Sequence, residues 1–152
     1  MSVLVENVQV SEGFVPPDLS VATDPLDVAV AALREADRAM ATVLRAVAAA
    51  GPRDGLSVRR HLALQASATG VDVGFVDRAV QTLSAMPRVW AAFDTGRLSW
   101  SQLRGIVLEA RRLSVAQRQV LDQALAGLLE SGLGEPDRIV DTTADLAARL
   151  DR

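Results

Sequence analysis

The segment from residue 89 to residue 109 constrains the fold of this chain more than any other, because it carries in succession the signals for a helix end, a turn and a helix start. Gly96 suits the left-handed backbone conformation in which many helices end. Ser99 is a preferred residue at a helix N-terminus, and Gln102, three positions later, completes a capping box. Since no part of the body of the chain shows the alternation of a strand, the sequence predicts an all-α fold.

The core of this fold has to be built mainly from Ala, Leu and Val, because 49% of the 152 residues are apolar but only 3% are aromatic. Such side chains suit closely packed helices, and a chain of this length forms one domain with a core of its own. The sequence contains no cysteine, which excludes a disulfide-stapled fold, a thiolate nucleophile and a metal site with Cys ligands.

Helix start and stop signals divide the chain into a tail and a helical domain. Residues 1–23 lack helical periodicity and are predicted to form a flexible, disordered N-terminal tail, after which Asp24 and Pro25 suit the N-cap and first turn of a helix. We expect residues 24–152 to form a single bundle of six or seven helices, over residues 25–50, 57–68, 72–86, 87–94, 100–112, 115–131 and 136–152. Ser57 is expected to cap the second helix and Gly70 to end it.

Nothing in the sequence indicates export or a membrane partner. There is no basic segment followed by an apolar one, as in a signal peptide, and no apolar run reaches the roughly 20 residues of a membrane helix. We therefore expect a cytoplasmic protein. All 16 basic residues are Arg, and Ala, Val, Leu, Gly and Asp are abundant. These residues have GC-rich codons, which indicates a high-GC bacterium or one of its phages.

The candidate catalytic and metal-binding residues lack partners. His61 is the only histidine, so neither a Ser-His-Asp triad nor a His-ligated metal site can be assembled around it. The chain has no Gly-rich phosphate loop. Asp137, Asp141 and Asp145 share one face of a helix, and we interpret them as a solvated acidic face. The sequence thus predicts no enzyme activity, no cofactor and no metal ion.

One pair of helices has the spacing of a helix-turn-helix motif. Ala66 is the small residue that lets two helices cross, Gly70 makes the turn, and Val76 anchors the second helix. In that arrangement Arg78 and Gln81 are the side chains able to reach base edges. The same spacing is common in helical proteins that bind no DNA, which leaves a purely structural role open.

The middle of the chain is basic although the net charge of the whole is −3. Residues 53–112 contain nine Arg and five acidic residues, which suggests an anionic partner such as double-stranded DNA. The candidate nucleic-acid-binding residues are Arg59, Arg60, Arg78, Gln81, Arg97, Arg104, Arg111 and Arg112. Alternatively, these Arg residues form a solvated surface, and Arg111 and Arg112 stabilise a helix C-terminus. Trp90 and Trp100 suit base stacking, but we favour a role as large core residues.

A set of short motifs lies between residue 33 and the C-terminus. It comprises Leu33, Asp37 and Leu44, Asp-Gly-Leu-Ser at 54–57, Gly70 with Val76 and Val80, Met86-Pro87, and Ala-Ala-Phe-Asp-Thr-Gly-Arg-Leu-Ser at 91–99 with Gln102. In these motifs the chain resembles the helical domain of unknown function of actinobacterial HNH-endonuclease proteins, also called the thirteen-E-twelve repeat family of mycobacteria. The last motif also resembles the helical DNA-binding region of chromosome-partitioning proteins.

The resemblance implies a helical domain that is associated with DNA. In that family the domain often precedes an HNH nuclease, whose metal site needs His ligands, and His61 lies outside any such motif. We therefore expect a non-catalytic DNA-associated domain without the nuclease part. The alternative is a protein-protein interaction or oligomerisation module that uses the apolar face of the first helix, with a second copy or another protein as partner.

Overall fold

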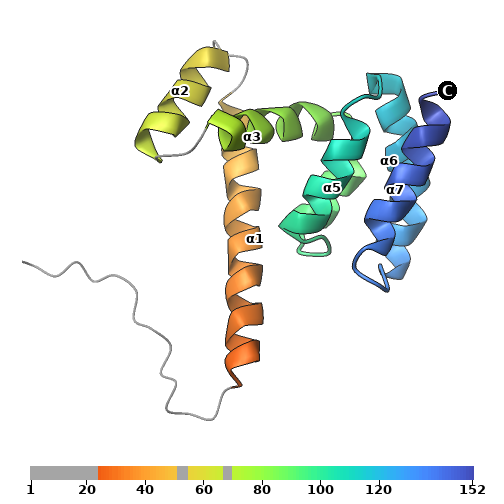
Figure 1. Ribbon diagram of the computed structural model, residues 1–152, viewed down its shortest axis with the longest axis horizontal. Helices are drawn as coiled ribbons and strands as arrows, with labels where there is room; N and C mark the ends of the chain where they lie inside the picture. Colours follow the sequence, from red (N-terminus) through yellow and green to blue (C-terminus); the bar gives the residue numbers. More distant parts are fainter. Residues whose placement is uncertain (1–23, 51–54, 67–69) are drawn as a thin grey trace, which may run out of the picture.

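The computed structural model describes residues 24–50, 55–66 and 70–152, and within these residues it contains helices and no strand (Figure 1). This confirms the predicted all-α fold. The helices are α1 (Pro25–Ala49), α2 (Gly55–Gln65), α3 (Gly70–Leu83), α4 (Pro87–Asp94), α5 (Trp100–Ala110), α6 (Val115–Ser131) and α7 (Arg138–Leu150). The predicted tail at 1–23 lies outside the described residues.

Helices α4 to α7 pack against one another as the main body, in which α5 and α7 form one pair and α4 and α6 another (Figure 1). Helix α3 packs on α5 and connects this body to α1 and α2. Leucine and isoleucine side chains fill the centre of the body without any exposure to solvent; they include Leu103, Ile106, Leu121, Leu125 and Ile139. The core is thus aliphatic, as the composition predicts.

The pairing of α5 with α7 depends on the absence of a side chain at Gly105. A Cβ atom at this position would lie 2.7 Å from Cγ1 and 2.8 Å from Cγ2 of Val140 on α7. Non-bonded carbon atoms do not approach each other this closely. Glycine therefore allows the two helix backbones to come nearer to each other than any other residue would.

The helix signals that the sequence shows between residues 96 and 102 are confirmed. Gly96 has a φ angle of 77°, and its N–H donates to the carbonyl of Phe93 as in a Schellman motif. Ser99 accepts a hydrogen bond from the Gln102 N–H at 3.1 Å, and the Gln102 side chain accepts one from the Ser99 N–H at 2.9 Å. Ser114 and Gln117 form a second capping box, at the start of α6. These elements fix where α4 ends and where α5 and α6 begin.

Carboxylates from distant parts of the chain also accept hydrogen bonds from the N-termini of α4 and α5. The Asp122 carboxylate on α6 accepts hydrogen bonds from the N–H groups of Arg88 (3.2 Å) and Val89 (3.0 Å) in the first turn of α4. The Asp37 carboxylate on α1 accepts one from the Trp100 N–H (2.8 Å) at the start of α5. Asp122 is buried, so its charge is stabilised by these N–H groups and by the helix dipole.

The two halves of α1 have different surroundings. Its C-terminal half lies against α3 and α4, with Leu44 fully buried and Met40 packed on the core. Arg45 forms an ion pair with Asp94 at the end of α4, and its guanidinium carbon lies 4.7 Å from the centre of the Trp90 ring. The N-terminal half of α1 extends beyond the body into solvent (Figure 1).

Several predicted helix boundaries are wrong, among them those of α2 and α3 and the start of α7, which lies at Arg138 and not at residue 136. α2 begins at Gly55, so Ser57 lies inside the helix and is not its cap. Gly70 is the first residue of α3 and does not end α2. α3 ends at Leu83, before the predicted residue 86, because Ala85 and Met86 donate hydrogen bonds three residues back and the following Pro87 disfavours helical conformation in the residue before it.

A candidate nucleic-acid interface

The candidate interface is centred on the outer side of α3. Arg78 and Gln81 are exposed there, as a DNA-contacting helix requires. On the same helix, Val73 and Phe75 are not presented to solvent in this way. Val73 is buried, and the ring of Phe75 packs edge-on against Trp100 with a centroid distance of 5.7 Å. These two side chains instead attach α3 to the rest of the molecule.

Helix α5 contributes the cations next to α3. The Arg104 guanidinium carbon lies 5.3 Å from the centre of the Phe75 ring, which places this charge at the junction of the two helices. Arg111 is exposed two helical turns after Arg104 and shares its face of α5. Arg78, one turn after Phe75 on α3, lies beside the same junction. We call Arg78, Gln81, Arg104 and Arg111 the basic face.

Helix α2 packs against α3 and adds two further Arg residues beside it. Arg59 forms an ion pair with Asp77 of α3, in which its Nε lies 3.1 Å from the carboxylate. Arg60 is exposed. Because Asp77 compensates the charge of Arg59, we expect Arg60 to attract an anion more strongly than Arg59 does.

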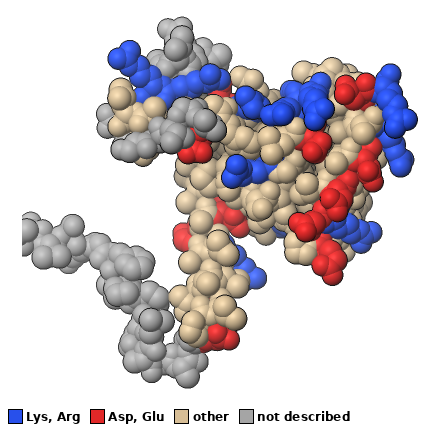
Figure 2. Space-filling model, viewed as in Figure 1, with Lys and Arg blue, Asp and Glu red and all other residues tan. Residues whose placement is uncertain are grey.

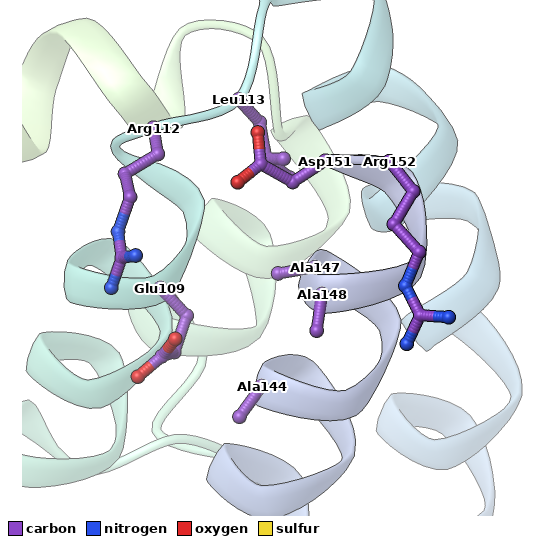
Figure 3. A pocket seen from close by; sticks show the side chains of 8 residues that line it. All are labelled: Glu109, Arg112, Leu113, Ala144, Ala147, Ala148, Asp151 and Arg152. Carbon is purple, nitrogen blue, oxygen red and sulfur yellow. The ribbon is translucent and has the colours of Figure 1, made fainter.

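Two of the predicted residues lie away from the basic face. Arg97 lines a hollow of about 290 Å³ between α4 and α6, together with Arg88, Thr95 and Glu130. Arg112 lines a different hollow between α5 and α7 (Figure 3). The sequence-predicted set of eight is therefore divided over three surfaces, and only the residues of α2, α3 and α5 named above form one surface.

The hollow between α5 and α7 has a volume of about 310 Å³. Glu109 and Arg112 stand on its α5 side, and the small side chains of α7 form the opposite wall (Figure 3). Asp151 and Arg152 lie at its end. Its lining combines both signs of charge with three alanines and one leucine.

The charged side chains are distributed unevenly over the molecule. Figure 2 shows Arg side chains over α2 and along the edge formed by α3 and the upper end of α5, whereas acidic side chains follow α7. Six Arg residues form no ion pair with another described residue: Arg60, Arg78, Arg97, Arg104, Arg111 and Arg112. Their charges are thus available to an anion in solution.

The helix-turn-helix prediction is only partly met. α2 and α3 pack against each other, and Val76 is partly buried on α3. Ala66, however, lies after the last residue of α2 and is exposed, so it does not serve as the small residue at a close crossing. The turn at 67–69 lies outside the described residues. The two helices therefore follow each other and pack together as in a helix-turn-helix, but they do not cross at Ala66 as predicted.

The remaining candidates behave as surface or core residues. His61 and the acidic residues of α7, including Asp141 and Asp145, are exposed. Over the ranges that the structure describes, no three His, Cys, Asp or Glu side chains are grouped so that they could hold a metal ion. Within the same ranges, no helix has the length and apolar character needed to cross a membrane. Trp90 is buried and Trp100 is partly buried, as expected for core residues.

Sequence reasoning missed two residues of the candidate interface. The Phe75 ring lies against the Arg104 guanidinium, and Asp77 forms an ion pair with Arg59. The sequence did contain a signal for the role of Asp77. A carboxylate on a helix predicted to face DNA is unfavourable unless a cation of the protein pairs with it. The contact between Phe75 and Arg104 joins two helices and has no signal in the local sequence.

Comparisons with protein-family models, with curated proteins and with solved structures found no match for this chain. The relationship to the HNH-associated helical domain accordingly stays a prediction from the sequence motifs.

Proposed function

We propose that this chain is a non-catalytic helical domain that binds the phosphate backbone of double-stranded DNA through the basic face. The observation that carries the proposal is the position of Arg104. Its guanidinium lies over the Phe75 ring at the junction of α3 and α5, with Arg78 and Arg111 exposed on either helix. Arg side chains on two packed helices present several donors to one anionic surface, as phosphate contacts require.

The stacking of Arg104 on Phe75 supports this role for a second reason. A long side chain that is already held against a ring loses less conformational freedom when it binds phosphate than a freely rotating one. The guanidinium still keeps its N–H donors, because no carboxylate among the described residues pairs with it. Arg104 is therefore expected to contribute more to binding than Arg60, for which the described residues provide no ring contact of this kind.

The proposal assigns Gln81 a secondary role. Gln81 is exposed on α3 next to the turn that carries Arg78, and an amide side chain can donate and accept at a base edge. The phosphate contacts would supply most of the affinity, and Gln81 would contribute only a preference among sequences.

The test is a fluorescence-anisotropy titration of a labelled mixed-sequence duplex at several salt concentrations. Three phosphate contacts predict that log K falls with log salt at a slope of about −3, since each contact on B-DNA contributes about −0.9. The variant Arg78→Glu/Arg104→Glu is expected to remove binding at moderate salt. The matched control is Arg138→Glu/Arg149→Glu, which makes the same charge change on α7 and is expected to retain most of the affinity.

Two outcomes would contradict the proposal. If the chain does not bind at low salt, DNA is not its partner. If both double variants weaken binding equally, the interaction depends on net charge alone and not on the basic face. Arg59→Glu is unsuitable as a probe, because it also places a second carboxylate beside Asp77.

A second function, association with a protein, is favoured by a different observation. The projecting half of α1 exposes large apolar side chains that the rest of the described chain does not cover. Apolar surface gathered on one helix face is typical of interaction sites.

A further inference from the structure

The projecting half of α1 carries an apolar stripe that has no partner within the described residues. Leu26, Val30 and Leu33 are 73%, 45% and 67% exposed, and they share one side of the helix because they are spaced by four and three residues. We call these three residues the apolar stripe. Figure 1 shows that this part of α1 extends past the edge of the body formed by α3 to α7.

The apolar stripe continues the line of residues by which α1 is attached to its own body. The same spacing of four and three residues leads from Leu33 to Asp37, which accepts the Trp100 N–H, and then to Met40 and the buried Leu44. A repeat of this kind is the pattern of a two-helix seam. One half of the seam is thus covered within the chain, whereas the other half is uncovered.

We propose that a second copy of this chain covers the apolar stripe, with the two α1 helices antiparallel. The charges beside the stripe determine this choice of partner. Asp27 and Arg34 are both exposed on the same flank of the stripe and are two helical turns apart, too far to pair within one helix. Neither forms an ion pair with another described residue.

Antiparallel pairing brings these two charges together across the interface. When Val30 of each copy lies near the two-fold axis, Asp27 of one copy faces Arg34 of the other, and the same contact occurs twice because the interface is isologous. In a parallel pair, each of these residues would instead lie at the level of its own equivalent. Opposite charges flanking an apolar seam select orientation in coiled coils in the same way.

The other flank of the stripe allows the helices to approach closely. Ala29 and Ala36 occupy it, and both are exposed. In the antiparallel arrangement centred near Val30, Ala29 lies close to the two-fold axis in both copies, so a small side chain occupies this flank where the helices meet. Hence one flank contributes charge complementarity and the other contributes close packing.

The shape of the molecule is compatible with this dimer. The uncovered part of α1, residues 25–36, is about 18 Å long at 1.5 Å per residue. Two such segments that overlap in antiparallel orientation place the two bodies at opposite ends of the paired region. The interface is small, so we expect a dissociation constant on the order of 10–100 µM rather than an obligate dimer.

The experiment is sedimentation velocity of the full chain from about 1 µM to several hundred µM, a range that brackets the expected dissociation constant. The wild type is expected to shift from monomer to dimer. Asp27→Arg and Arg34→Asp should each weaken the dimer about tenfold or more, because two like-charge contacts replace two attractive ones. The double variant Asp27→Arg/Arg34→Asp should dimerise again, and so should a mixture of the two single variants.

Glu35→Arg is the matched control, because it makes the same charge change as Asp27→Arg on the opposite, outer face of the same helix, where Glu35 pairs with Arg38. It is expected to leave the dimer intact. Leu33→Asp should abolish dimerisation, while Leu64→Asp on α2, with a similarly exposed leucine, should not.

A strict monomer at the highest concentration would overturn the proposal. Dimerisation that Leu33→Asp abolishes but that neither single charge variant affects would show a partner helix in another orientation, and would overturn the antiparallel arrangement. The dimer does not depend on the proposed DNA function, since none of its residues belongs to the basic face.

Discussion

Leu33 and Leu44 are the same residue type on the same helix, yet Leu33 is 67% exposed and Leu44 is fully buried. The difference separates the molecule into two regions. In the body, helices are held by buried leucines and by capping side chains such as Asp122. Among the described residues, the projecting half of α1 is held by its own backbone hydrogen bonds, by local side-chain contacts such as the Asp24 cap and the Glu35–Arg38 ion pair, and by its continuation into the packed half. The comparison shows that an amphipathic pattern predicts which face of a helix is apolar, but not whether the surface that covers this face belongs to the same chain.

The largest expected effect tests this comparison directly. Leu44→Ala should lower the free energy of unfolding by about 2–5 kcal/mol, because it removes buried methyl groups and leaves a cavity between α1 and the body. Leu33→Ala should change it by less than about 0.5 kcal/mol when measured on dilute, monomeric protein. Urea unfolding followed by circular dichroism gives both values. Equal effects would mean that the apolar stripe is covered within the chain.

The next largest effect concerns the cap that the body supplies to α4. Asp122→Ala leaves the N–H groups of Arg88 and Val89 without their acceptor and should destabilise the fold by about 1–3 kcal/mol. Asp122→Asn is the control, because its amide oxygen still accepts one of these hydrogen bonds, and it should retain more of the stability. The prediction is wrong if the two variants unfold at the same urea concentration.

A somewhat smaller effect is expected where α5 and α7 approach each other. Gly105→Ala introduces a methyl group within 2.7 Å of a Val140 methyl carbon and should destabilise by about 1–3 kcal/mol, although alanine is the better helix former. Gly127→Ala on α6 meets no atom within 4 Å and should stabilise by about 0.5–1 kcal/mol. Opposite signs in thermal unfolding would confirm the close approach. If Val140→Ala does not relieve the Gly105→Ala variant, the clash has been assigned to the wrong atom.

The parts of the fold that could be predicted are those that depend on neighbours within a few residues. Ser99 with Gln102, and Gly96 with its positive φ angle, are confirmed because a capping box or a Schellman motif is complete within about one helical turn. The cap that Asp122 provides, and the one that Asp37 provides, join residues far apart in the chain. No local pattern distinguishes these two carboxylates from the many that are solvated.

The same limit applies to the candidate interface. The sequence predicted eight residues from their charge and from motif spacing, but charge alone does not state which face of the fold a side chain occupies. Arg104 lies against α3 because its guanidinium is placed over the Phe75 ring, which also contacts Trp100 at the start of α5. Arg97, with the same charge, lies by a hollow between α4 and α6. Which cations share a surface is decided by helix packing, which depends on the whole core.

The smallest effect concerns the exposed contact that joins α1 to α4. Arg45→Met removes the ion pair with Asp94 and the cation over Trp90 but keeps most of the aliphatic stem, so it should destabilise by about 0.5–1 kcal/mol at low salt. Because the Arg45 side chain is 57% exposed, the ion-pair part of this loss should decrease as salt is raised. Arg45→Lys keeps the charge and should lose less. A loss as large as that of Leu44→Ala would mean that α1 is held to the body by charge, and the distinction between its packed and projecting halves would then rest on one side chain rather than on the buried seam.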